Sequence, residues 1–163
     1  MTSHIDDYRR RSGATVTPTD AFRTAVAQHD LAALEELFTE DIVLHSPVKF
    51  VPFTGRPAVL GLFGVLLRTF EDLRYVGALD GTVETAAGEP ADSAVLPFRA
   101  TIDGRDIHGI DLLQFAPDGR IKEFTVMVRP LSAVQTLGAA VLKGLVEDGL
   151  APAPDSAPAP SPS

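Results

Sequence analysis

Two strand-like segments joined by a tight turn constrain this chain more than any other feature of its sequence. Residues 105–115 and 121–131 are rich in apolar and β-branched residues, and Ala116-Pro117-Asp118-Gly119 lies between them. Proline supplies a fixed φ and glycine a permissive backbone, as short hairpin loops require. The pattern therefore predicts a long β-hairpin, and a single acidic residue, Asp111, interrupts the apolar run of its first strand.

Asp111 is the first candidate for a functional residue. An ionised carboxylate within an apolar strand needs a hydrogen-bonding partner or a shifted pKa. Strand alternation places Asp111 on the same face as Gly109, Leu113 and Phe115, with His108 on the other face. Either face could be the buried one, so Asp111 is either an acid/base group in a pocket or a carboxylate satisfied by neighbours or solvent.

The rest of the chain predicts a single α+β domain at residues 18–148, between two disordered ends. Residues 1–17 are polar and unpatterned, and residues 149–163 are rich in proline, alanine and serine, so neither can build a core. Apolar spacing and capping residues predict helices over about 19–29, 31–38, 58–70 and 132–146. The expected strands are 42–48, 74–79, 82–85, 93–102 and the two strands of the hairpin.

Composition narrows the range of partners. The formal net charge of -8 argues against a nucleic-acid surface, which needs a concentrated basic patch. The first residues lack the apolar core of a secretory signal, and no apolar run is long enough to span a membrane. Without cysteine, disulfides and thiolate metal sites are excluded, and a cytoplasmic location is expected. The histidines are too far apart to be neighbouring ligands on one helix, so we expect no metal and no cofactor.

The resemblance to a known family rests on three segments: HDLAALEELFTEDIVLHSPV, FTGRPAVLGLFGVLLRTF and GIDLLQFAPDGRIKEFTVMVRPL. In this order they resemble the nuclear transport factor 2-like superfamily and, within it, the SnoaL-like branch. The resemblance implies a cone-shaped fold, in which a curved antiparallel sheet wraps around N-terminal helices and a C-terminal helix follows. It also implies a deep apolar pocket, usually in a homodimer. One such scaffold carries isomerases, cyclases, epoxide hydrolases and non-catalytic binders.

The resemblance also implies positions for the residues of a site. Steroid isomerase relatives use an aspartate base and an oxyanion hole made by a tyrosine and a protonated aspartate. In this chain the base position falls on Ser46, the tyrosine on Phe22 and the protonated aspartate on Asp111. Of these three roles, the protonated aspartate is the one retained, so steroid isomerisation in its known form is not expected.

Two other activities of the superfamily make different demands. Epoxide hydrolase relatives need an arginine flanked by two aspartates, but those positions fall on Ala94, Leu96 and Val126. Polyketide cyclase relatives work through one acid/base residue, a role open to Asp111 or to His45 beside the matching base position. The intrinsic pKa of histidine suits proton exchange near neutrality, although a structural role for His45 is the alternative.

We therefore expect a small-molecule-binding protein, an isomerase, cyclase or hydrolase that acts on a mostly apolar substrate by acid/base catalysis. The alternative is a non-catalytic dimeric module that binds a ligand or another protein. The candidate catalytic residues are Asp111 and His45. The candidate ligand-binding residues are Phe22, Ser46, Phe53, Phe63, Leu96, Phe98, Leu113, Phe124 and Val126.

Overall fold

The structure is a computed structural model that describes residues 16–153. Its helices are α2 (Pro18–Ala27), α3 (Leu31–Leu37), α4 (Arg56–Thr69) and α5 (Leu131–Glu147). Its strands are β1 (Phe38–His45), β2 (Phe53–Thr54), β3 (Glu71–Tyr75), β4 (Leu79–Glu84), β5 (Pro90–Ile102), β6 (Arg105–Phe115) and β7 (Ile121–Arg129). The disordered ends expected from the sequence fall largely on residues 1–15 and 154–163, which lie outside the described residues.

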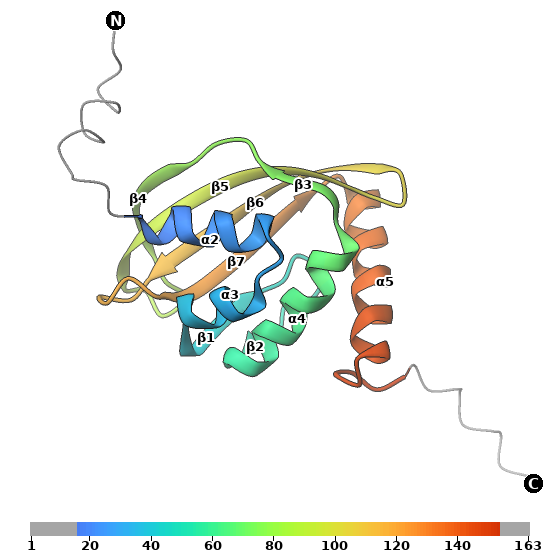
Figure 1. The fold of residues 1–163 in the computed structure, drawn as a ribbon, viewed down its shortest axis with the longest axis horizontal. Helices are drawn as coiled ribbons and strands as arrows, with labels where there is room; N and C mark the ends of the chain where they lie inside the picture. Colours follow the sequence, from blue (N-terminus) through green and yellow to red (C-terminus); the bar gives the residue numbers. More distant parts are fainter. Residues whose placement is uncertain (1–15, 154–163) are drawn as a thin grey trace, which may run out of the picture.

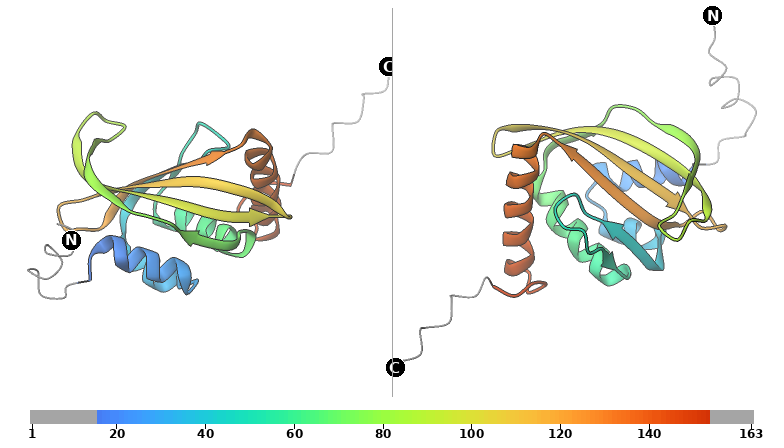
Figure 2. Two further views of the ribbon diagram at one scale, coloured as in Figure 1. Left: turned by 90° about the horizontal axis from the view of Figure 1, so that it is seen from above. Right: turned by 180° about the vertical axis from the view of Figure 1, so that it is seen from behind.

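The strands form one curved, seven-stranded sheet in the order β2-β1-β7-β6-β5-β3, with β4 also paired to β5. Helices α2, α3 and α4 cover one face of this sheet, and α5 stands across one end of it (Figures 1 and 2). This arrangement confirms the α+β cone fold. One detail differs, because β1 and β7 pair in parallel while the other pairs are antiparallel. A parallel pair needs a long crossover, and here helix α4 and the strands after it provide one.

The sequence predicts either Thr17 or Thr19 as the cap of the first helix and Asp30 as the cap of the second; the structure has Thr17 and Asp30. Thr17 Oγ1 accepts a hydrogen bond from Asp20 N at 3.1 Å, and Asp30 Oδ1 accepts one from Ala33 N at 3.0 Å. Each bond satisfies a backbone donor that the first helical turn leaves free. The strand expected at 42–48 instead starts at Phe38, because that side chain is fully buried and its backbone pairs with β7.

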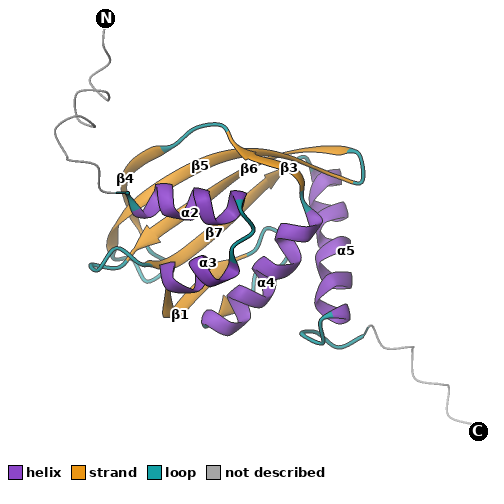
Figure 3. Cartoon of the chain, in the orientation of Figure 1, coloured by secondary structure: helices purple, strands orange, loops and turns teal. Residues whose placement is uncertain are grey.

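The structure also decides which face of the hairpin is the inner one. Along β6, Gly109, Asp111 and Leu113 are buried, whereas Ile110 is 40% exposed. Asp111 therefore points toward the helices, on the concave side of the sheet. Figure 3 shows α2 and α3 in front of that face, with α4 and α5 toward one end of the sheet.

Candidate functional site

An apolar cavity lies between the concave face of the sheet and helices α4 and α5. Its volume is about 50 Å³, which is room for a few water molecules and less than the several hundred Å³ of typical drug-sized sites. Helix α5 contributes Leu137 and Val141 to its wall. Among the residues that the structure describes, Ser46, Tyr75 and Asp111 are the polar side chains that line this cavity, and the remaining lining residues are apolar.

Asp111 and Tyr75 meet in this cavity from separate strands. The Tyr75 hydroxyl donates a hydrogen bond to Asp111 Oδ2 at 2.7 Å. Tyr75 lies on β3 and Asp111 on β6, and β5 runs between these two strands. Both side chains reach the same point because strand alternation directs Leu73 and Tyr75 inward from β3, as it directs Asp111 inward from β6.

Burial dominates the electrostatics of this pair. Asp111 is 6% exposed, and this desolvation raises its pKa to about 7, while the hydrogen bond from Tyr75 acts in the opposite direction. Desolvation also raises the pKa of Tyr75 well above its ordinary value, and the neighbouring Asp111 adds to the rise. Near neutral pH, Tyr75 therefore remains a hydrogen-bond donor, while Asp111 exchanges its proton.

A glycine shapes the floor of the cavity beside Asp111. Gly109 pairs with Phe98 across β6 and β5, and a Cβ atom on Gly109 would lie 2.1 Å from Phe98 Cζ. The absence of a side chain therefore lets the Phe98 ring approach the backbone at Gly109. From there the ring contacts Tyr75, with 6.2 Å between ring centroids in an edge-on arrangement. Phe98 thus supports the phenol that binds Asp111.

His45 lies on the other side of the sheet. Its neighbour Leu44 lines the cavity, so strand alternation turns His45 to the outer face. There His45 Nε2 lies 2.7 Å from Glu123 Oε1, which also accepts a hydrogen bond from Ala86 N at 3.2 Å. The turn after β4 curls over the outer face to make this contact (Figure 2). The structure therefore does not bring His45 and Asp111 together.

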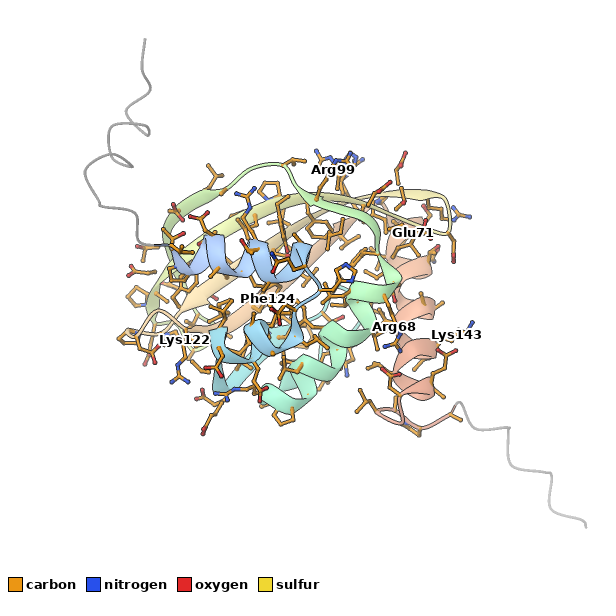
Figure 4. The ribbon with its side chains drawn as sticks, viewed as in Figure 1. Arg68, Glu71, Arg99, Lys122, Phe124 and Lys143 are labelled. Carbon is orange, nitrogen blue, oxygen red and sulfur yellow. The ribbon has the colours of Figure 1, made fainter. Side chains whose placement is uncertain are left out.

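The predicted ligand-binding residues divide into two groups. The residues that line the cavity are Ser46, Phe63, Phe98, Phe124 and Val126. The residues that lie outside its lining are Phe22, Leu96 and Leu113, which are fully buried in the core, and Phe53, whose ring lies 4.0 Å from Lys49 Nζ. Phe124 lies at the centre of the fold, behind α2 and α3 in Figure 4, and its ring centroid is 5.4 Å from that of Phe22.

Tyr75 is not identified by the sequence analysis. The strand expected at 74–79 lies at 71–75, so the inward direction of Tyr75 could not be assigned. One signal could have found it: Tyr75 lies two residues after Leu73, so strand alternation puts both side chains on one face. A buried phenol usually has a hydrogen-bond partner, which makes Asp111 a natural candidate.

Metal sites and membrane-spanning helices are both absent from the part of the chain that the structure describes. No group of three or more histidine, cysteine, aspartate or glutamate side chains within residues 16–153 is arranged to hold a metal ion. None of the helices in this part of the chain has both the length and the apolar character needed to cross a membrane.

Comparison with known proteins identifies one family. The model of the SnoaL-like domain matches residues 19–124. A structure of a steroid delta-isomerase from Pseudomonas aeruginosa is 34% identical, with a TM-score of 0.69, and the alignment covers 82% of this chain and 93% of that chain. Comparison with the curated proteins gave no match.

Two more distant structures share the fold alone. A protein with a cystatin-like fold from Silicibacter pomeroyi is 23% identical, with a TM-score of 0.74, covering 87% of this chain and 92% of that chain. A SnoaL-like polyketide cyclase, described as putative, from Shewanella denitrificans is 14% identical, with a TM-score of 0.52, covering 77% of this chain and 95% of that chain. The family match ends at residue 124, so α5, which closes the cavity, follows the matched segment.

Proposed function

The chain belongs to the SnoaL-like family of the nuclear transport factor 2-like superfamily, and from this premise we propose that it is an acid/base enzyme acting on a mostly apolar small molecule. One observation carries the proposal. Asp111 is the carboxyl group that lines a mostly apolar cavity, and burial raises its pKa to about 7. A buried group with such a pKa, facing a cavity, is a candidate for proton transfer.

In the proposed reaction, the Asp111 carboxylate takes a proton from the substrate and returns it to a different atom. A pKa near the working pH supports both steps, because neither the acid nor the base form is scarce. The Tyr75 hydroxyl holds Oδ2 at 2.7 Å, which leaves Oδ1 for the substrate. Tyr75 also stabilises the ionised form, so its hydrogen bond tunes the pKa of the acid/base group.

A single carboxyl group favours an isomerase or a cyclase over a hydrolase. Hydrolysis requires a water molecule held by groups that activate it. Besides Tyr75, the cavity offers one hydroxyl, that of Ser46, which accepts a hydrogen bond from Val48 N at 3.1 Å. A steroid delta-isomerase is among the related structures. Phe22, at the position where the resemblance implies a tyrosine, cannot donate a hydrogen bond. Tyr75 on β3 donates one to Asp111 instead.

The size of the cavity implies that substrate entry requires movement. At about 50 Å³, the space is too small for a substrate with several rings. Helix α5 contributes Leu137 and Val141 to the wall. We therefore propose that the substrate displaces α5 from α4 as it enters.

A proton-exchange experiment tests this function without knowledge of the natural substrate. A panel of apolar ketones is incubated with the protein in D₂O, and deuterium incorporation next to the carbonyl is followed by proton NMR. We expect the wild-type protein to catalyse exchange with an apparent pKa of about 7, and Asp111→Asn to bind the same ketones without exchange. Equal exchange by the two proteins contradicts the assignment of Asp111.

The second candidate is a non-catalytic binding module. The small volume of the cavity favours this alternative. It predicts ligands that raise the melting temperature of the wild-type protein, since a ligand that binds the native state stabilises it, but no proton exchange with any of them. The expected homodimer and cytoplasmic location are part of both proposals, and sedimentation of the purified chain checks the first of these.

A further inference from the structure

Helix α5 is held by different contacts in its two halves. In the first half, Leu137 is buried in the core, where it packs with Phe98 and Ile107. In the second half, Gly144 is buried against helix α4. The cavity lies at the boundary between the two halves, because Leu137 and Val141 are the α5 residues in its wall. Movement of the second half alone would therefore uncover the cavity.

Two glycines let the second half of α5 lie close to α4. A Cβ atom on Gly144 would lie 2.5 Å from Val65 Cγ1, and a Cβ atom on Gly61 would lie 2.7 Å from Leu150 Cδ1. Each glycine thus accepts an apolar side chain from the other segment. Such contacts act over a short range, since a gap of about 1 Å already forfeits up to half of the dispersion attraction.

The chain after α5 turns back to make the second of these contacts. Gly149 has a φ of 71°, and its N–H donates to Val146 O at 3.0 Å, while Leu150 N donates to Leu145 O at 2.8 Å. A glycine in the left-handed conformation with these two hydrogen bonds is a common way to end a helix. The turn directs the side chain of Leu150 toward Gly61 on α4.

One charged side chain joins α4 to the end of α5. Arg68 Nη1 donates to Asp148 Oδ2 at 2.8 Å, and Arg68 Nη2 donates to Gly144 O at 3.2 Å. Nη1 also donates to Gly64 O at 3.2 Å, which holds the guanidinium against its own helix. In Figure 4, Arg68 extends from α4 toward α5. The side chains of Arg68 and Asp148 are 45% and 37% exposed, so water can solvate both charges when they separate, and the pair opens at a small cost.

We propose that residues 141–150 form a gate over the cavity, and that Arg68 is the latch that sets how often this gate opens. The first half of α5 stays anchored in the core through Leu137, while the gate moves away from α4 and takes Val141 out of the cavity wall. This inference rests on the proposed entry of the substrate past α5. It does not depend on the acid/base role of Asp111.

The first test measures how fast an apolar molecule enters the full chain. N-phenyl-1-naphthylamine is uncharged and becomes fluorescent in apolar surroundings, so stopped-flow fluorescence follows its entry. We expect Arg68→Gln to bind this probe about two- to fivefold faster than the wild type, as loss of an exposed ion pair implies. Salt at about 1 M should speed entry into the wild type and not into Arg68→Gln, because salt screens exposed charges. The matched control is Arg120→Gln, which loses an exposed 2.8 Å pair with Asp118 in the β6–β7 turn and should behave as the wild type.

The second test fixes the gate in its closed position. The chain contains no cysteine, so Val65→Cys/Gly144→Cys offers a single possible disulfide, between facing positions of α4 and α5. We expect the oxidised double variant to take up the probe at least about tenfold more slowly than the same protein after reduction, because the gate can then open by local unfolding alone. A third measurement needs no ligand: the amides of residues 142–147 should exchange with D₂O faster in Arg68→Gln, while those of α2 should not change.

Equal probe entry into Arg68→Gln and the wild type at low salt overturns the proposal, as does rapid entry into the oxidised double variant. If the double variant does not fold, as judged by circular dichroism, hydrogen exchange decides, and equal protection of residues 142–147 in Arg68→Gln and the wild type overturns the gate. The proposed reaction fails separately. A protein that catalyses no proton exchange with ketones but shows the expected probe rates has the gate without the reaction, and the reverse result leaves the reaction without the gate.

Discussion

Replacing Asp111 by asparagine should make the stability of the protein less sensitive to pH. Asparagine has nearly the same shape as aspartate, and its side-chain oxygen can still accept the hydrogen bond from Tyr75. What it lacks is the ionised form, which burial in the cavity disfavours. The difference in free energy of unfolding between Asp111→Asn and the wild type therefore reports the cost of ionising Asp111 in the folded state.

The sign and size of this difference follow from the two pKa values. Burial raises the pKa of Asp111 from 3.8 to about 7, so between these values the folded state binds more protons than the unfolded state, and wild-type stability falls as pH rises. The penalty is absent below about pH 4 and complete above about pH 7. At about 1.4 kcal/mol per pKa unit, it amounts to about 4 kcal/mol.

Urea unfolding at about pH 4.5, 6, 7 and 8 measures this difference. We expect the stability of Asp111→Asn relative to the wild type to rise by about 3 kcal/mol between about pH 4.5 and pH 8, because about 1 kcal/mol of the penalty is already present at pH 4.5. Asp118→Asn is the matched control, because hydrogen bonds from Arg120 lower the pKa of Asp118, so the stability lost with Asp118 should be nearly constant from about pH 4.5 to pH 8. A difference for Asp111→Asn that does not change with pH refutes the assignment of a buried, ionisable carboxyl group.

Three further substitutions probe the same geometry. Tyr75→Phe removes a hydrogen bond that favours the ionised carboxylate, so it should raise the pKa of Asp111 above about 7. An unchanged or lower pKa in a carbon-13 NMR titration contradicts the proposal that Tyr75 stabilises the carboxylate. Gly109→Ala places a methyl group in the Phe98 ring, and we expect a loss of about 1–3 kcal/mol in urea unfolding; wild-type stability would show that the ring is free to move. His45→Gln should change ligand affinity in the cavity by less than about twofold, because His45 faces away from the cavity. It should also speed hydrogen exchange in the turn after β4. A large loss of affinity would show that His45 does contribute to ligand binding.

The sequence by itself determined those features that depend on neighbours along the chain. Asp30 caps the second helix as expected, and Thr17, one of two candidates, caps the first, because a cap is a hydrogen bond to a backbone group three residues away. The hairpin forms at Gly119, which has a φ of 85°, a conformation that glycine adopts readily. Alternation also placed Asp111 and Leu113 on one face of a strand before the structure showed that face to be buried.

Only the tertiary structure decided what those features do together. Asp111 has a pKa of about 7 because helices and strands from the whole chain remove it from water, and Tyr75 reaches it across an intervening strand. The same folding turns His45 to the outer face and brings Glu123 to it. Desolvation and hydrogen bonding at a site depend on groups that are distant in sequence and close in space, so the chemistry of Asp111 arises when the sheet curves around the helices.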